Sequence, residues 1–153
     1  MSLLILYDRL TMRSELSPDE LRRKIAGRID NSRPVWLAFG SQFSSEKYFG
    51  GESTQGFWVV RGLPGANPYR PLLRIAILPS DSGSFVSTVF FGAGALLIPV
   101  VMIVPVIVGL HFGDWRMLGV MLVVAMVVHL VAWTAYGSER DTLIAWLNGI
   151  LKA

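Results

Sequence analysis

Two long stretches of this chain carry no charged side chain. No Asp, Glu, Lys or Arg occurs in residues 82–113 or in residues 117–138. Because roughly 20 apolar residues in a helix span a hydrocarbon core about 30 Å thick, each stretch is long enough to cross a bilayer. We therefore expect two membrane-spanning helices, at about residues 85–110 and 117–137.

The connection between these two apolar segments is the short sequence HFGDWR. Two antiparallel helices joined so tightly pack against each other, so residues 85–137 are expected to form a transmembrane helical hairpin. Small residues let the backbones of membrane helices approach closely. The residues expected to make this contact are Gly92, Gly94, Ala95, Gly119 and Ala125.

Three residues inside the apolar segments have both a functional and an ordinary interpretation. Pro99 and Pro105 each remove a backbone donor and predict a kink, and broken helices can line transport sites. His129 is a candidate proton relay, but a relay needs a chain of partners and the two segments contain no carboxylate. Prolines tolerated in a membrane helix and a neutral histidine near the interface are the simpler interpretations.

The basic residues set the expected orientation. Arg70 and Arg74 precede the first segment and Arg140 follows the second, whereas the connecting loop has only Arg116, beside Asp114. Cytoplasmic flanks of membrane helices carry the excess of Lys and Arg. Both termini are therefore predicted to be cytoplasmic.

Residues 1–84 have the pattern of a small cytoplasmic α+β domain. In LSPDELRRKIAGRI, Ser17 is a helix N-cap and Glu20 completes a capping box. The apolar residues that follow recur every four positions, and this stripe either covers a sheet or lies on an anionic membrane surface. Short runs rich in β-branched and aromatic residues predict a short antiparallel sheet. These runs are LLILYDRL, PVWLAFG, EKYFGG, FWVVRG, LLRIAIL and SFVST.

A separate amphipathic helix is expected at residues 138–153. Ser138 is a candidate N-cap, and Leu143, Leu147 and Ile150 belong to an apolar stripe with helical period. This stripe is buried either in the membrane interface or on the N-terminal sheet. The second arrangement closes the domain around both ends of the chain, and we prefer it.

A candidate binding site lies around the loop GLPGANP, which has an arginine near each edge. Arg61, Tyr69, Arg70 and Arg74 would form a basic and aromatic patch suited to a lipid headgroup, another anionic ligand or a partner protein. The alternative is that Arg61 and Arg70 fasten the loop by hydrogen bonds to its carbonyls, while their stems cover apolar surface.

Several classes of function have no support in the sequence. The chain contains no cysteine, which excludes disulfides, thiolate metal sites and cysteine nucleophiles. It shows no nucleophile motif, phosphate-binding loop or spaced histidine pair. The net charge of +3 lacks the concentrated basic stripe typical of nucleic-acid binding. We therefore predict no catalytic residue, no metal site, no cofactor and no nucleic-acid partner.

The order of these signals resembles a loose group of small, uncharacterised bacterial two-span membrane proteins. The shared pattern is a Tyr-x-Gly turn, a Phe-x-Val-x-Arg strand and a Tyr-Arg-Pro segment before the membrane hairpin. The matching residues here are Tyr48, Gly50, Phe57, Val59, Arg61, Tyr69, Arg70 and Pro71. The chain departs from the group in its long GLPGANP loop and in having little strand between Ser84 and the membrane. The resemblance implies this architecture and a bacterial inner membrane, and no established activity.

The function expected from these features is a membrane-anchored, non-catalytic binding or sensing module at the cytoplasmic face. The alternative is a small structural subunit, or a self-assembling hairpin, of a larger membrane complex. A pore or transporter component is less favoured, because two spans without polar lining do not enclose a pathway. The expected partners are the lipid bilayer, a second copy or another membrane protein, and an anionic lipid or small ligand.

Overall fold

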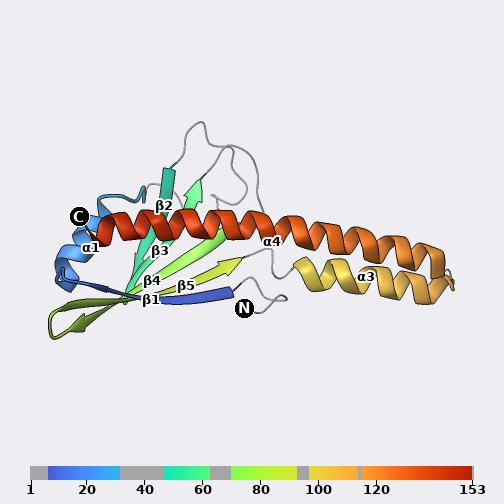
Figure 1. The fold of residues 1–153 in the computed structure, drawn as a ribbon, viewed down its shortest axis with the longest axis horizontal. Helices are drawn as coiled ribbons and strands as arrows, with labels where there is room; N and C mark the ends of the chain where they lie inside the picture. Colours follow the sequence, from blue (N-terminus) through green and yellow to red (C-terminus); the bar gives the residue numbers. More distant parts are fainter. Residues whose placement is uncertain (1–6, 32–46, 63–69, 93–96, 114, 153) are drawn as a thin grey trace.

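The structure is a computed structural model that describes residues 7–31, 47–62, 70–92, 97–113 and 115–152. Within these residues, a sheet lies at one end of the molecule and two helices project from the other (Figure 1). The elements, in chain order, are β1 (Tyr7–Ser14), α1 (Pro18–Ala26), β2 (Lys47–Ser53), β3 (Gly56–Gly62), β4 (Pro71–Ser80), β5 (Gly83–Gly92), α3 (Leu97–Phe112) and α4 (Trp115–Leu151).

The sheet of the described residues has five strands in the order β1-β5-β4-β3-β2. Every neighbouring pair is antiparallel, which confirms the predicted antiparallel sheet. Strands β2 to β5 follow one another as a meander, and β1 adds to the far side of β5. A two-residue turn at Thr54 and Gln55 joins β2 to β3, because Ser53 pairs with Gly56.

The predicted strands agree with the structure to different degrees. β2, β3 and β4 cover the runs EKYFGG, FWVVRG and LLRIAIL almost fully. β1 lies four residues later than the predicted run at residues 3–10. The predicted strand at residues 34–40 lies outside the described residues.

The segment expected to begin the first membrane helix forms β5 instead. Residues 85–91 pair with β1 on one side, residues 85–92 pair with β4 on the other, and α3 begins only at Leu97. The side chains of Val86 and Phe90 are fully buried, whereas that of Phe85 is exposed. Burial of even-numbered residues and exposure of an odd-numbered one is the two-residue alternation of a strand. The predicted strand SFVST is therefore confirmed as part of β5, whereas the predictions of a helix from residue 85 and of little strand after Ser84 are wrong.

The physical reason for this error is that an absence of charge reports the environment and not the backbone conformation. β5 lies between two strands and one of its faces is covered by α4, so charged side chains are unfavourable there, as they are in a membrane helix. Gly92, expected to pack between helices, instead pairs with Pro71 at the end of β5, so that prediction is also wrong. Gly94 and Ala95 lie outside the described residues.

Helix α1 begins as the sequence predicted. The Ser17 side chain accepts a hydrogen bond from the backbone N–H of Glu20, and the Glu20 carboxylate accepts one from the backbone N–H of Ser17. This reciprocal pair satisfies two backbone donors that the first turn would otherwise leave open. Leu21 and Ile25 are fully buried, so the apolar stripe of α1 covers the sheet.

Helix α4 is one continuous helix of 37 residues, about 55 Å long at 1.5 Å per residue. It passes through Ser138 without interruption, so the prediction that a separate helix starts there is wrong. The Ser138 carbonyl accepts a hydrogen bond from the Thr142 hydroxyl at 3.0 Å, inside the helix. Tyr136 and Leu143, on either side of Ser138, are both buried in the same core, so the helix packs on the sheet through this point.

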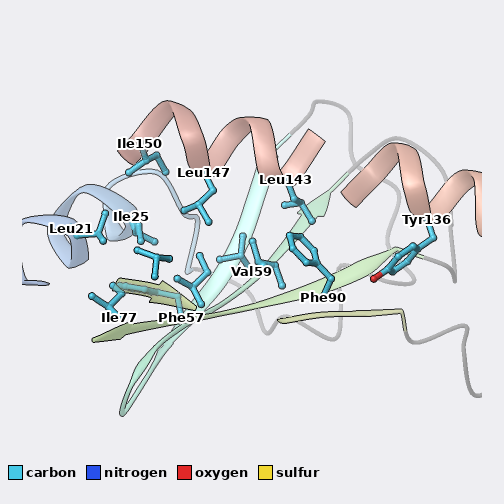
Figure 2. Close-up of a cluster of buried hydrophobic side chains, with 13 residues drawn as sticks. Leu21, Ile25, Phe57, Val59, Ile77, Phe90, Tyr136, Leu143, Leu147 and Ile150 are labelled. Atoms are coloured by element: carbon cyan, nitrogen blue, oxygen red, sulfur yellow. The ribbon is translucent and has the colours of Figure 1, made fainter. Parts of the chain in front are cut away.

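The hydrophobic core lies between the sheet and the C-terminal half of α4, with α1 closing one end (Figure 2). Trp146 of α4 stacks on Tyr48 of β2, with ring centroids 4.7 Å apart. The predicted stripe of the last helix therefore lies on the sheet. The core residues labelled in Figure 2 are Leu21, Ile25, Phe57, Val59, Ile77, Phe90, Tyr136, Leu143, Leu147 and Ile150.

Helix α3 and the first half of α4 lie side by side and antiparallel, away from the sheet (Figure 1). The turn between them includes Gly113, whose φ of 66° favours glycine. A Cβ at Gly109 would lie 2.8 Å from the Leu118 Cβ, so the two helices approach closely there. Among the described residues, one helix, α4, is long and apolar enough to cross a membrane.

Candidate functional site

Charged side chains gather where α4 leaves the sheet. Arg61 of β3 donates from Nη1 to Glu139 Oε2 of α4 at 3.1 Å. One residue along α4, Arg140 donates from Nη1 to Asp8 Oδ2 of β1 at 2.9 Å. Because β3 and β1 lie on opposite sides of the β5–β4 pair, the two ion pairs hold α4 from two directions. We call these four residues, together with Arg70, the junction cluster.

The Arg61–Glu139 pair is the more shielded of these two interactions. The two side chains are only 17% and 10% exposed, whereas those of Arg140 and Asp8 are 20% and 38% exposed. Exposed ion pairs contribute little to stability, while breaking a buried pair is costly because one charge loses its counterion. Glu139 is therefore the residue on which the electrostatics of the cluster depend.

Arg70 adds a second cation close to Glu139. Only 1% of Arg70 is exposed to solvent. Burial lowers the pKa of Arg70, the nearby Glu139 carboxylate raises it, and the positive charge of Arg61 lowers it. An arginine nevertheless stays charged in proteins. The three side chains Arg61, Arg70 and Glu139 together therefore carry one excess positive charge in a largely buried place.

The structure divides the predicted binding patch. Arg61 and Arg70 lie near the same carboxylate, as described above. Arg74 is exposed and lies over the Trp58 ring, 5.3 Å from its centroid, and its neighbours Leu73 and Ile75 face the core. Arg74 therefore lies on the opposite face of the sheet from Arg61. Tyr69 lies outside the described residues.

A second charged surface lies on the side of the sheet that faces away from the helices. On β1, Leu10 and Met12 pack against the core, so the exposed Arg9 and Arg13 alternate to the outer side. Phe85, Phe91 and Leu78 lie on the same side and are 41%, 37% and 49% exposed. We call this surface the arginine face. Its defining residues are Arg9, Arg13, Arg74, Leu78, Phe85 and Phe91.

The predicted helix-packing residues have different outcomes in the hairpin. Ala125 is buried on the part of α4 that runs beside α3. A Cβ added at Gly119 would meet nothing within 4 Å, so this glycine makes no close approach inside one chain. The close approach is at Gly109, which the sequence analysis did not select, although it lies four residues from the loop where the two helices must come together.

Scans of the chain against protein-family models, curated proteins and solved structures found no match. Within the part of the chain that the structure describes, no group of three His, Asp or Glu side chains is placed to hold a metal ion. The candidate sites are therefore the junction cluster and the arginine face. Asp8 and Glu139 are not predictable as partners from the sequence pattern, because each lies far along the chain from the arginine that it contacts.

Proposed function

We propose that this protein is a membrane-anchored, non-catalytic binding or sensing module, with its sheet domain at the cytoplasmic face of a bacterial inner membrane. The observation that carries the proposal is the division of α4 into two halves. The half beside α3 exposes large apolar side chains, while the half after Tyr136 buries its apolar stripe against the sheet.

The dimensions of α4 support a transmembrane position for its first half. From Leu118 to Tyr136 the helix rises about 28 Å, close to the roughly 30 Å of a hydrocarbon core. The first charges after this stretch are Glu139 and Arg140, both in the junction cluster. Large exposed side chains, including Val120, Val123 and Val127, would be unfavourable in water and are stable in lipid.

Helix α3 supports a hairpin in place of a single span. It exposes Ile103, Ile107 and Leu110, and it lies antiparallel to α4 (Figure 1). Its 16 residues rise about 24 Å, which is most of the thickness of a hydrocarbon core. In this arrangement the chain enters and leaves the membrane on the side of the sheet domain.

The proposed module acts by binding, because its charged residues are arranged as ion pairs and as an exposed surface. The junction cluster fixes the sheet to α4, so a signal that tilts the hairpin would also move the sheet. A contribution of Arg61, Tyr69, Arg70 and Arg74 to ligand binding stays a prediction.

Cysteine accessibility tests the membrane topology directly, because the natural chain contains no cysteine. Single cysteines are introduced by Arg116→Cys at the far end of the hairpin and by Ser82→Cys in the β4–β5 turn. With a membrane-impermeant maleimide, we expect labelling of Arg116→Cys in intact cells and of Ser82→Cys only after permeabilisation. Labelling of Ser82→Cys in intact cells would contradict the orientation, and protection of Arg116→Cys in intact cells would contradict a complete crossing.

Self-assembly of the hairpin is a second candidate function, favoured by Gly119. Small residues mark close contacts between membrane helices, and the space around Gly119 is open within one chain. A second copy would fit against this position. If so, Gly119→Leu should abolish crosslinked dimers in membranes while Gly149→Leu, at another open glycine on the same helix, leaves them unchanged.

A further inference from the structure

The arginine face collects three cations on its strands, and Glu15, which follows β1, lines the same hollow as Arg13. One row of paired residues crosses the sheet from Arg9 through Val89 and Arg74 to Trp58. A second row contains Arg13, Phe85 and Leu78. Among the described residues, the outward positions of β1, β5 and β4 hold no Asp or Glu, and neither Arg9 nor Arg74 forms an ion pair.

The aromatic rings on this face hold two of the three arginines in place. The Arg13 guanidinium lies 5.9 Å from the centroid of the Phe85 ring, and the Arg74 guanidinium lies 5.3 Å from that of Trp58. A guanidinium that stacks on a ring uses its flat face and keeps its N–H donors in the plane available for a carboxylate. Arg13 also donates to the Ser82 hydroxyl, which further fixes its position.

We propose that the arginine face is a docking surface for an acidic, amphipathic segment of a partner protein. Carboxylates of the segment pair with Arg9, Arg13 and Arg74, and its apolar side chains cover Phe85 and Leu78. Charge complementarity selects this occupant, because an apolar partner alone would leave three cations facing it without counterions. The excess positive charge of the chain argues against a second copy as the occupant.

The spacing of the cations fits a short segment. Arg9 and Arg74 are separated by one strand, which places their backbones roughly 10 Å apart. Arg13 lies four residues along β1 from Arg9, or roughly 13 Å. An extended chain advances about 13 Å in four residues, so carboxylates four residues apart match Arg9 and Arg13. Thr11 and Ser87 lie midway between these two arginines, and the apolar Phe85 and Leu78 lie in the row of Arg13, where an apolar side chain of the segment next to a carboxylate would meet them.

Two other occupants, a lipid surface and single-stranded nucleic acid, fit less well. The exclusion of lipid rests on the proposed function, because the membrane anchor determines which way the arginine face points. Strands β1 and β5 run lengthwise beside α4 (Figure 1), so with α4 crossing the bilayer the face points sideways and away from lipid. Single-stranded nucleic acid binds by stacking bases on aromatic faces, and the faces of Phe85 and Trp58 are already in contact with arginines.

The test uses the full-length protein in phosphatidylcholine nanodiscs and a fluorescent peptide in which Glu, Thr, Leu and Thr repeat. We expect saturable binding by anisotropy that weakens with added salt. The double variant Arg9→Gln/Arg74→Gln should bind about tenfold more weakly or worse, as for interface arginines. The control Arg28→Gln, at an exposed arginine beyond the end of α1, should bind as the wild type does. Circular dichroism checks that the variants stay folded.

Three results would overturn the proposal. Equal binding of a peptide with Gln in place of Glu would show that charge is not recognised. Unchanged binding by the double variant would place the site elsewhere. Tighter binding of an oligothymidylate, lost in the double variant, would make the face a nucleic-acid platform. Failure of the chain to enter nanodiscs would contradict the anchor alone, because the same titration in non-ionic detergent still measures the arginine face.

Discussion

Glu139 of α4 carries the negative charge that faces both Arg61 and Arg70. Glu139→Gln should therefore lower the free energy of unfolding by about 2 kcal/mol, because it leaves two shielded cations near each other. Arg61→Gln should lower the free energy of unfolding by a smaller amount, because the Glu139 carboxylate then still has the Arg70 guanidinium nearby. Urea unfolding of the full-length protein in mild detergent, followed by tryptophan fluorescence, measures both values. Equal losses in the two variants would show that Arg70 does not interact with this carboxylate.

Glu20 gives the N-terminus of α1 a dependence on pH. Hydrogen bonds from the Ser17 side chain and backbone hold the pKa of Glu20 below its usual range. A carboxylate with a lowered folded-state pKa stabilises the protein above its unfolded pKa, about 4.3, and this contribution is lost as the pH falls through the folded pKa. The wild type should therefore melt at a higher temperature than Glu20→Gln near pH 6.5, and this difference should shrink near pH 3. A difference that does not change with pH would exclude the carboxylate as its source.

At the scale of elements, the hairpin depends on one glycine. Gly109→Leu should destabilise the packing of α3 on α4 by about 1 to 3 kcal/mol, because even a Cβ at this position would overlap Leu118. Gly119→Leu is the matched control inside one chain, because its side chain would meet open space. Thermal unfolding by circular dichroism in detergent compares the two variants. A larger effect at Gly119 would mean that contacts between chains dominate.

The elements show which signals a sequence carries locally. The start of α1 was predictable because Ser17 and Glu20 are three residues apart and their hydrogen bonds form within one turn. The strands β2, β3 and β4 were predictable because alternation and turn residues are also local signals. The first part of β5, SFVST, was predictable as a strand, but the absence of charge from residue 82 to residue 113 does not show where the strand ends and the helix begins, and pairing with β1 and β4 decides this.

The candidate sites depended on contacts that are distant in sequence. Arg61 and Glu139 are 78 residues apart, and Arg140 and Asp8 are 132 apart. Arg61 and Arg74 are close in sequence to the same loop, but strand alternation places them on opposite faces of the sheet. A stricter count of alternation from Arg74 through Leu73 and Ile75 would have separated them. The residue that pairs with Arg61 was not accessible to this kind of reasoning.

At the scale of the whole molecule, the continuity of α4 sets the geometry. Spin labels at Arg116→Cys and Gly149→Cys should give a narrow distance distribution near 50 Å, the rise of an unbroken helix over this interval. Gly137→Pro should shorten and broaden the distribution, because proline removes a backbone hydrogen bond and kinks the helix. Gly137→Ala is the control and should leave it unchanged. Double electron–electron resonance makes the measurement, and a broad distribution in the parent pair would show a hinge near Ser138.

The position of Leu143, Leu147 and Ile150 after the strands and the hairpin in the sequence also determines when the sheet domain can fold during synthesis. The strands leave the ribosome first, but one wall of their core belongs to residues that are made after the hairpin. If the hairpin spans the membrane as proposed, its insertion must therefore succeed before the domain is complete. Under the proposed topology, a chain in which only one of the two helices inserted would leave these three side chains on the opposite side of the bilayer from the strands. Its incomplete sheet would be open to proteolysis, so complete insertion and survival are coupled.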